Sequence, residues 1–157
     1  MILQFLFAGA VCAISAVRSG VPFLARAKDG QLPQLPLISI IEDDESVRVA
    51  TQSFVRSLGF AACAFASAEE FLQSPRLHDT SCVIADVQMS GMSGVELQSL
   101  LVAQGHRTPV IFITAFHEEH IRARAMNAGA IGFLSKPVNG QILIECLDEA
   151  LNRRNGG

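Results

Sequence analysis

Cysteine is scarce in this 157-residue chain, and no two cysteines have the C-x-x-C spacing that metal sites and redox centres use. The four cysteines are far apart, and three lie inside apolar runs: Cys12, Cys63, Cys82 and Cys146. This pattern disfavours a disulfide or metal framework and favours buried free thiols. Because free thiols persist in a reducing compartment, the cysteine usage predicts a cytoplasmic location.

Positive charge is also limited. The chain has 12 lysine and arginine residues against 15 aspartates and glutamates, which gives a formal net charge of -3. A general nucleic-acid-binding surface needs a basic face, so the composition argues against that class. The sequence has no internal repeat and no low-complexity tract. Half of its residues are hydrophobic, which is enough for one continuous core with roughly 35 residues to spare.

Residues 1–36 differ from the rest of the chain. No charged side chain occurs from Met1 to Val17; basic residues follow, and then glycines and prolines typical of an irregular linker. Three interpretations are open: a membrane anchor, a cleaved secretory signal, and a start without a folded role. An anchor would be short, because such a helix rises about 25 Å against a hydrocarbon core of about 30 Å. If it inserts, the basic residues would hold the following domain in the cytoplasm.

From residue 37 onward, short apolar runs alternate with longer amphipathic stretches. The runs are Leu37–Ile41, Phe60–Phe65, Cys82–Ala85, Val110–Ile113 and Ala130–Leu134. Continuous short runs of this kind suit strands that are buried on both faces, as in a parallel sheet. Five strand-helix units in about 120 residues predict a doubly wound α/β fold.

Helix start and stop signals lie between the runs. The segments 67–70 and 93–96 match capping boxes, which satisfy the free amides at a helix start. Gly59 and Gly129 stand directly before predicted strands, where helix C-caps fall. The last helix is expected to pack on the core through one apolar face. That face consists of Ile142, Leu143, Cys146, Leu147 and Ala150.

Polar residues follow four of the five predicted strands. An acidic run, residues 42–45, follows the first strand, Asp86 the third, Thr114 the fourth and Lys136 the fifth. One such aspartate is more simply explained as a helix cap. However, the carboxyl ends of parallel strands meet at one edge, where doubly wound folds place their functional groups. The four together therefore predict a site.

The chemistry of this edge favours a hard metal ion. Two or three carboxylates within a few ångströms repel one another unless a proton or a cation neutralises them. Oxygen ligands without histidine or cysteine select an ion such as Mg²⁺. The histidines lie elsewhere, and none is assigned to metal: His78, His106, His117 and His120.

A magnesium ion beside a carboxylate, a lysine and a hydroxyl is the equipment for phosphoryl transfer to aspartate. Asp86 would be the nucleophile. Lys136 would offset charge on the phosphoryl group, and the Thr114 hydroxyl would bond one of its oxygens. A cis peptide bond before Pro137 would turn the lysine toward the site.

Four segments, in this order and spacing, closely resemble the receiver domains of two-component response regulators, and residues 67–71 and 92–97 look most like the FixJ-type group. The four segments are Ile-Ile-Glu-Asp-Asp-Glu-Ser-Val-Arg (40–48), Ile-Ala-Asp-Val-Gln-Met-Ser-Gly-Met-Ser-Gly-Val-Glu-Leu (84–97), Val-Ile-Phe-Ile-Thr-Ala (110–115) and Ala-Gly-Ala-Ile-Gly-Phe-Leu-Ser-Lys-Pro (128–137). The resemblance covers residues 37–154. It implies a flavodoxin-like (βα)5 fold with strand order 2-1-3-4-5.

The resemblance also implies a phosphoacceptor and a set of metal ligands. Asp86 matches the phosphoacceptor, and Asp43 with Asp44 matches the family's acidic pair. Asp44 is expected to bind Mg²⁺ directly and Asp43 through water. The backbone carbonyl of Gln88 is expected to be a further ligand.

Three more residues match the family's switch and phosphate site: Thr114 the switch hydroxyl, Phe133 the switch aromatic and Lys136 the phosphate-binding lysine. The implied donor is a sensor histidine kinase or a phosphotransfer protein. Phosphorylation would bias a surface made by residues 117–127, the fifth strand and residues 141–150 toward an output partner or a second copy. FixJ-type relatives normally continue into a DNA-binding domain, which this sequence does not include, so no direct nucleic-acid binding is expected of it.

The sequence departs from the family pattern at a few positions. Ser90 stands where the family usually has proline, which would loosen that loop slightly. Gln88 and Phe116 are expected to influence the lifetime of the phosphate. Gln88 also replaces the second aspartate that hydrolases of the haloacid dehalogenase type use as general acid and base. The chain is therefore predicted to be a signalling phosphoacceptor with slow self-dephosphorylation, not an enzyme.

Other functions remain as alternatives. A receiver can bind partners without being phosphorylated, and a magnesium-dependent phosphatase with an aspartate nucleophile would use a similar site. A nucleotide-binding module fits least well, because it would need a glycine-rich turn after the first strand, where four acidic residues stand instead.

Overall fold

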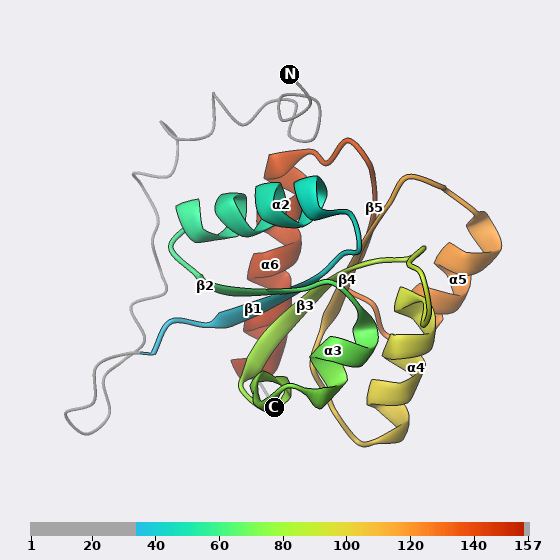
Figure 1. The fold of residues 1–157 in the computed structure, drawn as a ribbon, viewed down its shortest axis with the longest axis horizontal. Helices are drawn as coiled ribbons and strands as arrows, with labels where there is room; N and C mark the ends of the chain where they lie inside the picture. The colour runs from blue at the N-terminus through green and yellow to red at the C-terminus, as the bar shows by residue number, and fades with distance from the viewer. Residues whose placement is uncertain (1–33, 156–157) are drawn as a thin grey trace.

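The computed structural model describes residues 34–155, which form a parallel five-stranded sheet with helices on both faces (Figure 1). The strands are β1 (Leu37–Ile41), β2 (Ala61–Phe65), β3 (Thr80–Asp86), β4 (Val110–Thr114) and β5 (Gly132–Ser135). They lie in the order β2-β1-β3-β4-β5, and each neighbouring pair is parallel. The predicted doubly wound, flavodoxin-like fold with strand order 2-1-3-4-5 is confirmed.

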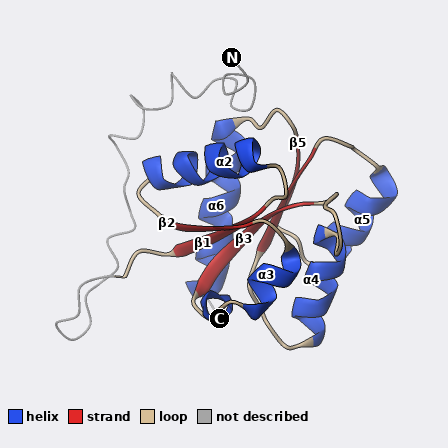
Figure 2. Cartoon of the chain, in the orientation of Figure 1, coloured by secondary structure: helices blue, strands red, loops and turns tan. Residues whose placement is uncertain are grey.

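The helices divide between the two faces of the sheet (Figure 2). They are α2 (Glu45–Ser57), α3 (Ala68–Gln73), the short 3-10 helix η2 (Pro75–Leu77), α4 (Gly94–Ala103), α5 (Glu119–Asn127) and α6 (Gly140–Asn155). One buried cluster joins the sheet to α2 and α6, and a second joins its other face to α3, α4 and α5. Both faces are thus covered, which explains why the strands have continuous apolar runs.

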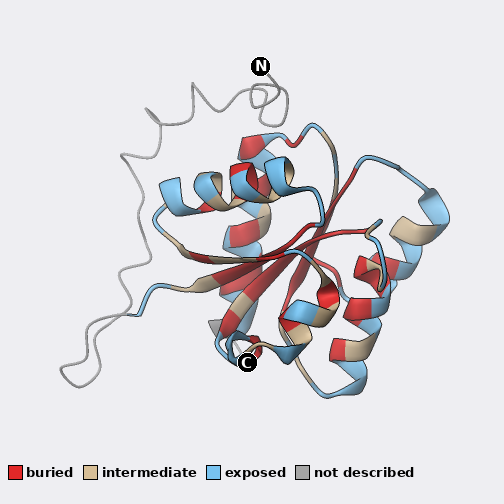
Figure 3. Ribbon diagram, viewed as in Figure 1, coloured by how far each residue is buried: buried red, intermediate tan, exposed pale blue. Residues whose placement is uncertain are grey.

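The buried residues run through the strands and line the inner sides of the helices (Figure 3). All five residues of β4 are buried. The predicted inner face of α6 is largely confirmed, since Leu143, Leu147 and Ala150 are fully buried. Ile142 is an exception, since it is 44% exposed, and the buried stripe also includes Leu151.

The predicted helix ends also agree with the structure. Ser93 and Glu96 form a complete capping box at the start of α4. At α3, the Ser67 hydroxyl accepts from the Glu70 amide, but the Glu70 carboxylate accepts from the amide of Ala66 and not from that of Ser67. Gly59 and Gly129 have φ angles of +91° and +94°, the left-handed conformation expected at these helix ends.

None of the helices within residues 34–155 has the length and apolar character needed to cross a membrane. The predicted apolar start, residues 1–17, and nearly all of the linker that follows lie outside the described residues. The anchor, signal and non-folded interpretations of that segment therefore stay predictions.

Candidate functional site

The carboxyl ends of β1, β3, β4 and β5 meet at one edge of the sheet, and the polar residues predicted from the sequence lie there. Asp86 ends β3 and Thr114 ends β4, while Glu42 and Lys136 follow β1 and β5 directly. Glu42 and Asp86 are only 4% and 7% exposed, and Thr114 is fully buried. We call this edge the carboxyl-end site. Its polar groups are held at the rim of an apolar core, where charges interact more strongly than in water.

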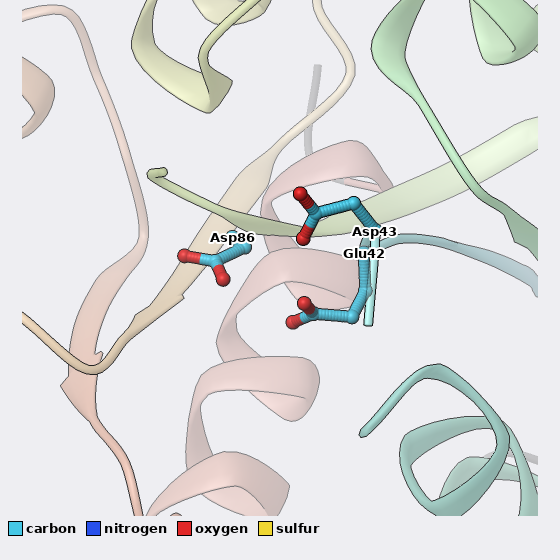
Figure 4. A group of neighbouring side chains, drawn as sticks. All are labelled: Glu42, Asp43 and Asp86. Carbon is cyan, nitrogen blue, oxygen red and sulfur yellow. The ribbon is translucent and has the colours of Figure 1, made fainter. Parts of the chain in front are cut away.

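Three carboxylates gather at the carboxyl-end site. Figure 4 shows Glu42 and Asp43 at the end of β1 turned toward Asp86 at the end of β3. Carboxylate oxygens of the three residues all lie within 4.8 Å of one another. No other group of three or more such side chains within residues 34–155 could hold a metal ion. Anions this close repel one another, so the site requires a counter-charge.

Lys136 supplies part of that counter-charge. Its Nζ donates to Asp86 Oδ2 at 2.8 Å and to Glu42 Oε2 at 2.9 Å. Burial raises the pKa of Glu42 to about 7, although the hydrogen bond and charge of Lys136 oppose the rise. Burial alone would lower the pKa of Lys136, but its hydrogen bonds to Asp86 and Glu42 outweigh this and raise it. Lys136 therefore stays charged, and Glu42 titrates near neutral pH.

The peptide bond between Lys136 and Pro137 is cis, as the sequence suggested. The lysine amide donates to the carbonyl of Thr114 at 2.8 Å, which ties the end of β5 to the end of β4. The side chain then extends across to Glu42 and Asp86.

Asp43 is fixed by a backbone amide from the loop after β3. The Ser90 amide donates to Asp43 Oδ2 at 3.0 Å, and the Ser90 hydroxyl lies 3.5 Å from the same oxygen. The amide hydrogen bond is the main reason why the pKa of Asp43 is lowered. Asp43 is thus an anion with one oxygen engaged, facing Glu42 and Asp86.

The structure does not bring Asp44 into this cluster. Its carboxylate turns back over α2, caps the helix and accepts from the Val47 amide at 3.0 Å. Asp44 is therefore not one of the three grouped carboxylates, because the residue that joins Asp43 and Asp86 is Glu42. The role of Asp44 as the direct metal ligand stays a prediction. The capping role of Asp44 could have been recognised in the sequence, because Asp44 stands at the start of a helix, where aspartate is a preferred cap.

The predicted switch residues lie on the two strands beyond β3: Thr114 ends β4 and Phe133 lies in β5. The Thr114 hydroxyl donates to the carbonyl of Phe116 at 3.1 Å and accepts from its amide at 3.2 Å. Phe133 is mostly buried against Phe112, with ring centroids 5.9 Å apart, and against the His117 ring at 5.6 Å. The phenyl ring of Phe116 points outward and is 60% exposed. Thr114 therefore ends the strand next to β3, and its hydroxyl is bonded to its own turn.

The loop between β3 and α4 is held closely around Asp86. The Gln88 amide donates to Asp86 Oδ1 at 3.1 Å. Glu69, which the sequence analysis did not identify, accepts from the Met92 amide at 2.9 Å. Gly94 fits because it has no Cβ, since an added Cβ would lie 2.2 Å from the Asp86 carbonyl oxygen. No motif indicates the Glu69 contact, because α3 and this loop are distant in the sequence.

The donor set of the carboxyl-end site suits a hard divalent cation such as Mg²⁺. The three grouped side chains offer only carboxylate oxygens, and neither histidine nor cysteine is among them. Such an ion keeps several waters and binds one or two carboxylates, which leaves places for other oxygen ligands. The site thus combines an acidic cation pocket, a nearly buried carboxylate and a fixed ammonium group.

Comparisons with known proteins agree with this geometry. The family model "Response regulator receiver domain" matches residues 38–148. Nodulation protein W of Bradyrhizobium diazoefficiens is 38% identical over 117 residues, which cover 74% of this chain and 52% of that protein. Transcriptional regulatory protein FixJ of Azorhizobium caulinodans is 33% identical over 122 residues, covering 78% and 58%. The chain therefore spans about half the length of the curated relatives it matches.

Solved structures of response regulators are also similar to this chain. The response regulator StyR superposes with a TM-score of 0.71 at 38% identity, over 78% of this chain and 64% of that one. The FixJ-N structure superposes with a TM-score of 0.69 at 32% identity, over 76% of this chain and 96% of that one.

Proposed function

Because this chain belongs to the family of response-regulator receiver domains of two-component systems, we propose that it accepts a phosphoryl group on Asp86. The donor would be a phosphohistidine on a sensor histidine kinase or on a phosphotransfer protein in the cytoplasm. The observation that supports this most strongly is the ammonium of Lys136, which is bonded to both Asp86 and Glu42. This arrangement places a charge-neutralising ammonium group directly beside the Asp86 carboxylate.

In the proposed reaction, an oxygen of Asp86 attacks the phosphorus while the phosphorus–nitrogen bond of the phosphohistidine breaks. The products are an acyl phosphate on Asp86 and a free imidazole. Lys136 would then donate to a phosphoryl oxygen instead of to the carboxylate alone. The Thr114 hydroxyl would leave the Phe116 carbonyl and donate to a second phosphoryl oxygen.

The residues that would hold Mg²⁺ are Asp43 and Asp86, with the Gln88 carbonyl as a further ligand and Glu42 acting through water. When bound, the ion would offset the charge of the phosphoryl oxygens. This assignment replaces Asp44 with a residue whose carboxylate faces Asp86. Gln88 and Phe116 would set the lifetime of the acyl phosphate, and self-dephosphorylation would be slow.

The proposed output is a change in the surface formed by α5, β5 and α6. When Thr114 moves toward the phosphate, Phe133 would shift into the space beside it. Phe133 packs on His117, whose Nδ1 is 3.0 Å from the Ser135 hydroxyl. A shift of Phe133 therefore changes the turn before α5 and the end of β5 together, which would favour an output partner or a second copy.

The proposal is tested by incubating the full chain with acetyl phosphate and Mg²⁺ and measuring the intact mass. We expect a gain of one phosphoryl group that disappears in Asp86→Asn. Asp43→Asn should lose most of the labelling, whereas its neighbour Asp44→Asn should keep it and serves as the matched control.

Other outcomes would count against the proposal. An absence of labelling in the wild-type chain, or labelling that persists in Asp86→Asn, would contradict it and favour a phosphorylation-independent receiver. Release of many equivalents of phosphate per chain would favour the phosphatase alternative.

A further inference from the structure

The opposite edge of the sheet, at the amino ends of the strands, has two neighbouring cavities. The first, of about 770 Å³, is bounded by residues 34–37, the segment from η2 into β3, and the last turns of α6. The second, of about 400 Å³, is bounded by the turns before β4 and β5 and again by the end of α6. The acidic cluster lies at the other end of the strands, so these cavities do not belong to the carboxyl-end site.

The two cavities adjoin one another. Arg154 lines both of them. Beside it, His78 of the first cavity and His106 of the second are in ring contact, with centroids 5.5 Å apart. We call the combined depression the amino-end groove.

The amino-end groove is positively charged although the chain as a whole has a net charge of -3. Its charged lining residues are Arg76, Asp79, Arg107, Arg153 and Arg154. Asp79, the one acidic residue among them, is paired with Arg76. Within residues 34–155, Arg107 makes no hydrogen bond or ion pair. Arg154 is positioned by a 2.7 Å hydrogen bond from Nη1 to the Thr80 carbonyl. Arg153 pairs with Glu149. Within the described residues, the guanidinium groups of Arg107 and Arg154 are therefore the two in the groove that lack a carboxylate partner.

We propose that the amino-end groove binds an acidic peptide segment of a partner protein. Guanidinium groups pair with carboxylates through two parallel hydrogen bonds. Between them the groove has apolar lining, including Leu37, Ile131 and Leu151, which suits aliphatic side chains of such a peptide. The partner's segment would thus alternate acidic and aliphatic residues and would lie across the end of α6.

Other occupants fit the groove less well. The chain's own residues 1–33 contain Arg18, Arg26 and Lys28 but a single acid, Asp29, so their charge does not complement the groove. A single-stranded nucleic acid would favour aromatic rings for base stacking, and the groove has no phenylalanine, tyrosine or tryptophan in its lining.

The test uses fluorescence polarisation of a labelled peptide of alternating glutamate and leucine, titrated with the full chain. We expect saturable binding that weakens about tenfold in Arg107→Glu, as expected when an attractive charge becomes repulsive. Arg107→Glu breaks no hydrogen bond or ion pair within residues 34–155, so it should not unfold the chain. Arg122→Glu, an equal charge change on exposed α5, is the matched control and should bind like the wild type.

Several results would overturn the proposal: no binding, equal binding by Arg107→Glu, or stronger binding of a lysine-leucine peptide or of an oligothymidine strand. Asp86 labelling by acetyl phosphate, measured on Arg107→Glu, should be unchanged. Loss of that labelling in Arg107→Glu would also overturn the separation of the two sites. Failure of wild-type labelling would concern the proposed function alone.

Discussion

Charged side chains are buried at one end of the parallel sheet and exposed at the other. At the carboxyl end, Glu42 and Asp86 are nearly buried and share one ammonium, that of Lys136. At the amino end the arginines are exposed, and where one is paired, as Arg153 is with Glu149, its partner is exposed too. Both ends are built from loops between the same strands and helices. The two ends therefore differ in how deeply their charged side chains are buried, which we call enclosure, and not in the number of charged residues.

Enclosure decides what each end can do. Charges held at a buried rim interact strongly, shift one another's pKa values and cannot be satisfied by water, which is the condition for chemistry. Exposed arginines remain hydrated, cost the fold little, and are available to a partner. We therefore expect substitutions at the carboxyl end to change stability, pH dependence and phosphorylation together, and substitutions at the amino end to change binding alone.

The largest expected effect comes from Lys136→Met. This change leaves two nearly buried carboxylates without their shared ammonium, which should lower the free energy of unfolding by about 3 kcal/mol at pH 8. Labelling by acetyl phosphate should fall by about 100-fold, because the group that offsets phosphoryl charge is lost. Urea denaturation and intact-mass labelling rates measure the two effects.

The matched change at the amino end is Arg153→Ala, which breaks an exposed ion pair with Glu149. Its free energy of unfolding should stay within about 0.5 kcal/mol of the wild type, and its labelling rate should not change. If Arg153→Ala lowers the free energy of unfolding as much as Lys136→Met does, then burial of the charged groups does not explain the difference between the two ends.

The next largest effect is a pH dependence of the free energy of unfolding that is caused by Glu42. Its pKa is raised from 4.5 to about 7 by burial, so between these values the folded chain binds more protons at Glu42 than the unfolded chain does. The free energy of unfolding must then fall as pH rises through this range, and above pH 7 the whole loss is present. Glu42→Gln removes the loss. Without metal, the variant should gain about 1–2 kcal/mol relative to wild type between pH 4.5 and pH 8.

Urea denaturation in EDTA at several pH values measures this gain. Glu149→Gln, the control at the exposed ion pair, should differ from wild type by less than about 0.5 kcal/mol throughout. A constant difference between Glu42→Gln and the wild type across the range would mean that burial does not control the charge of Glu42.

The sequence predicted the carboxyl-end site well because its members occupy positions defined by the strand pattern. Asp86, Thr114 and Lys136 each come directly after an apolar run, and parallel strands bring such positions together. The acidic run 42–45 was harder, since consecutive residues point in different directions. Which of them faces Asp86 depends on the residue at which α2 begins, and Asp44 is used as the cap of that helix.

The amino-end groove had no such signal. Its arginines and histidines come from the segment around η2, from the turn before β4 and from the end of α6, which are separated by many residues in the sequence. No sequence spacing relates the three segments to one another. Their proximity is a result of tertiary packing and could not be obtained from strand periodicity or helix caps.

The smallest expected effect concerns a backbone amide at the enclosed end. The Ser90 amide holds Asp43 Oδ2 at 3.0 Å and lowers the pKa of Asp43, while the Ser90 hydroxyl is more distant at 3.5 Å. Proline has no amide hydrogen, so Ser90→Pro removes this bond. We expect the dissociation constant for Mg²⁺, measured by calorimetry, to rise about threefold, because one hydrogen bond that orients the ligand is lost.

Ser90→Ala keeps the amide and removes only the hydroxyl, so its affinity for Mg²⁺ should match that of the wild type. Equal weakening in both variants would assign the effect to the hydroxyl. No weakening in Ser90→Pro would mean that Asp43 is oriented without help from the loop. In that case the carboxyl-end site would be held together by its side chains alone. The backbone of the β3–α4 loop would then tolerate substitution without loss of Mg²⁺ affinity, as the turns around the amino-end groove are expected to do.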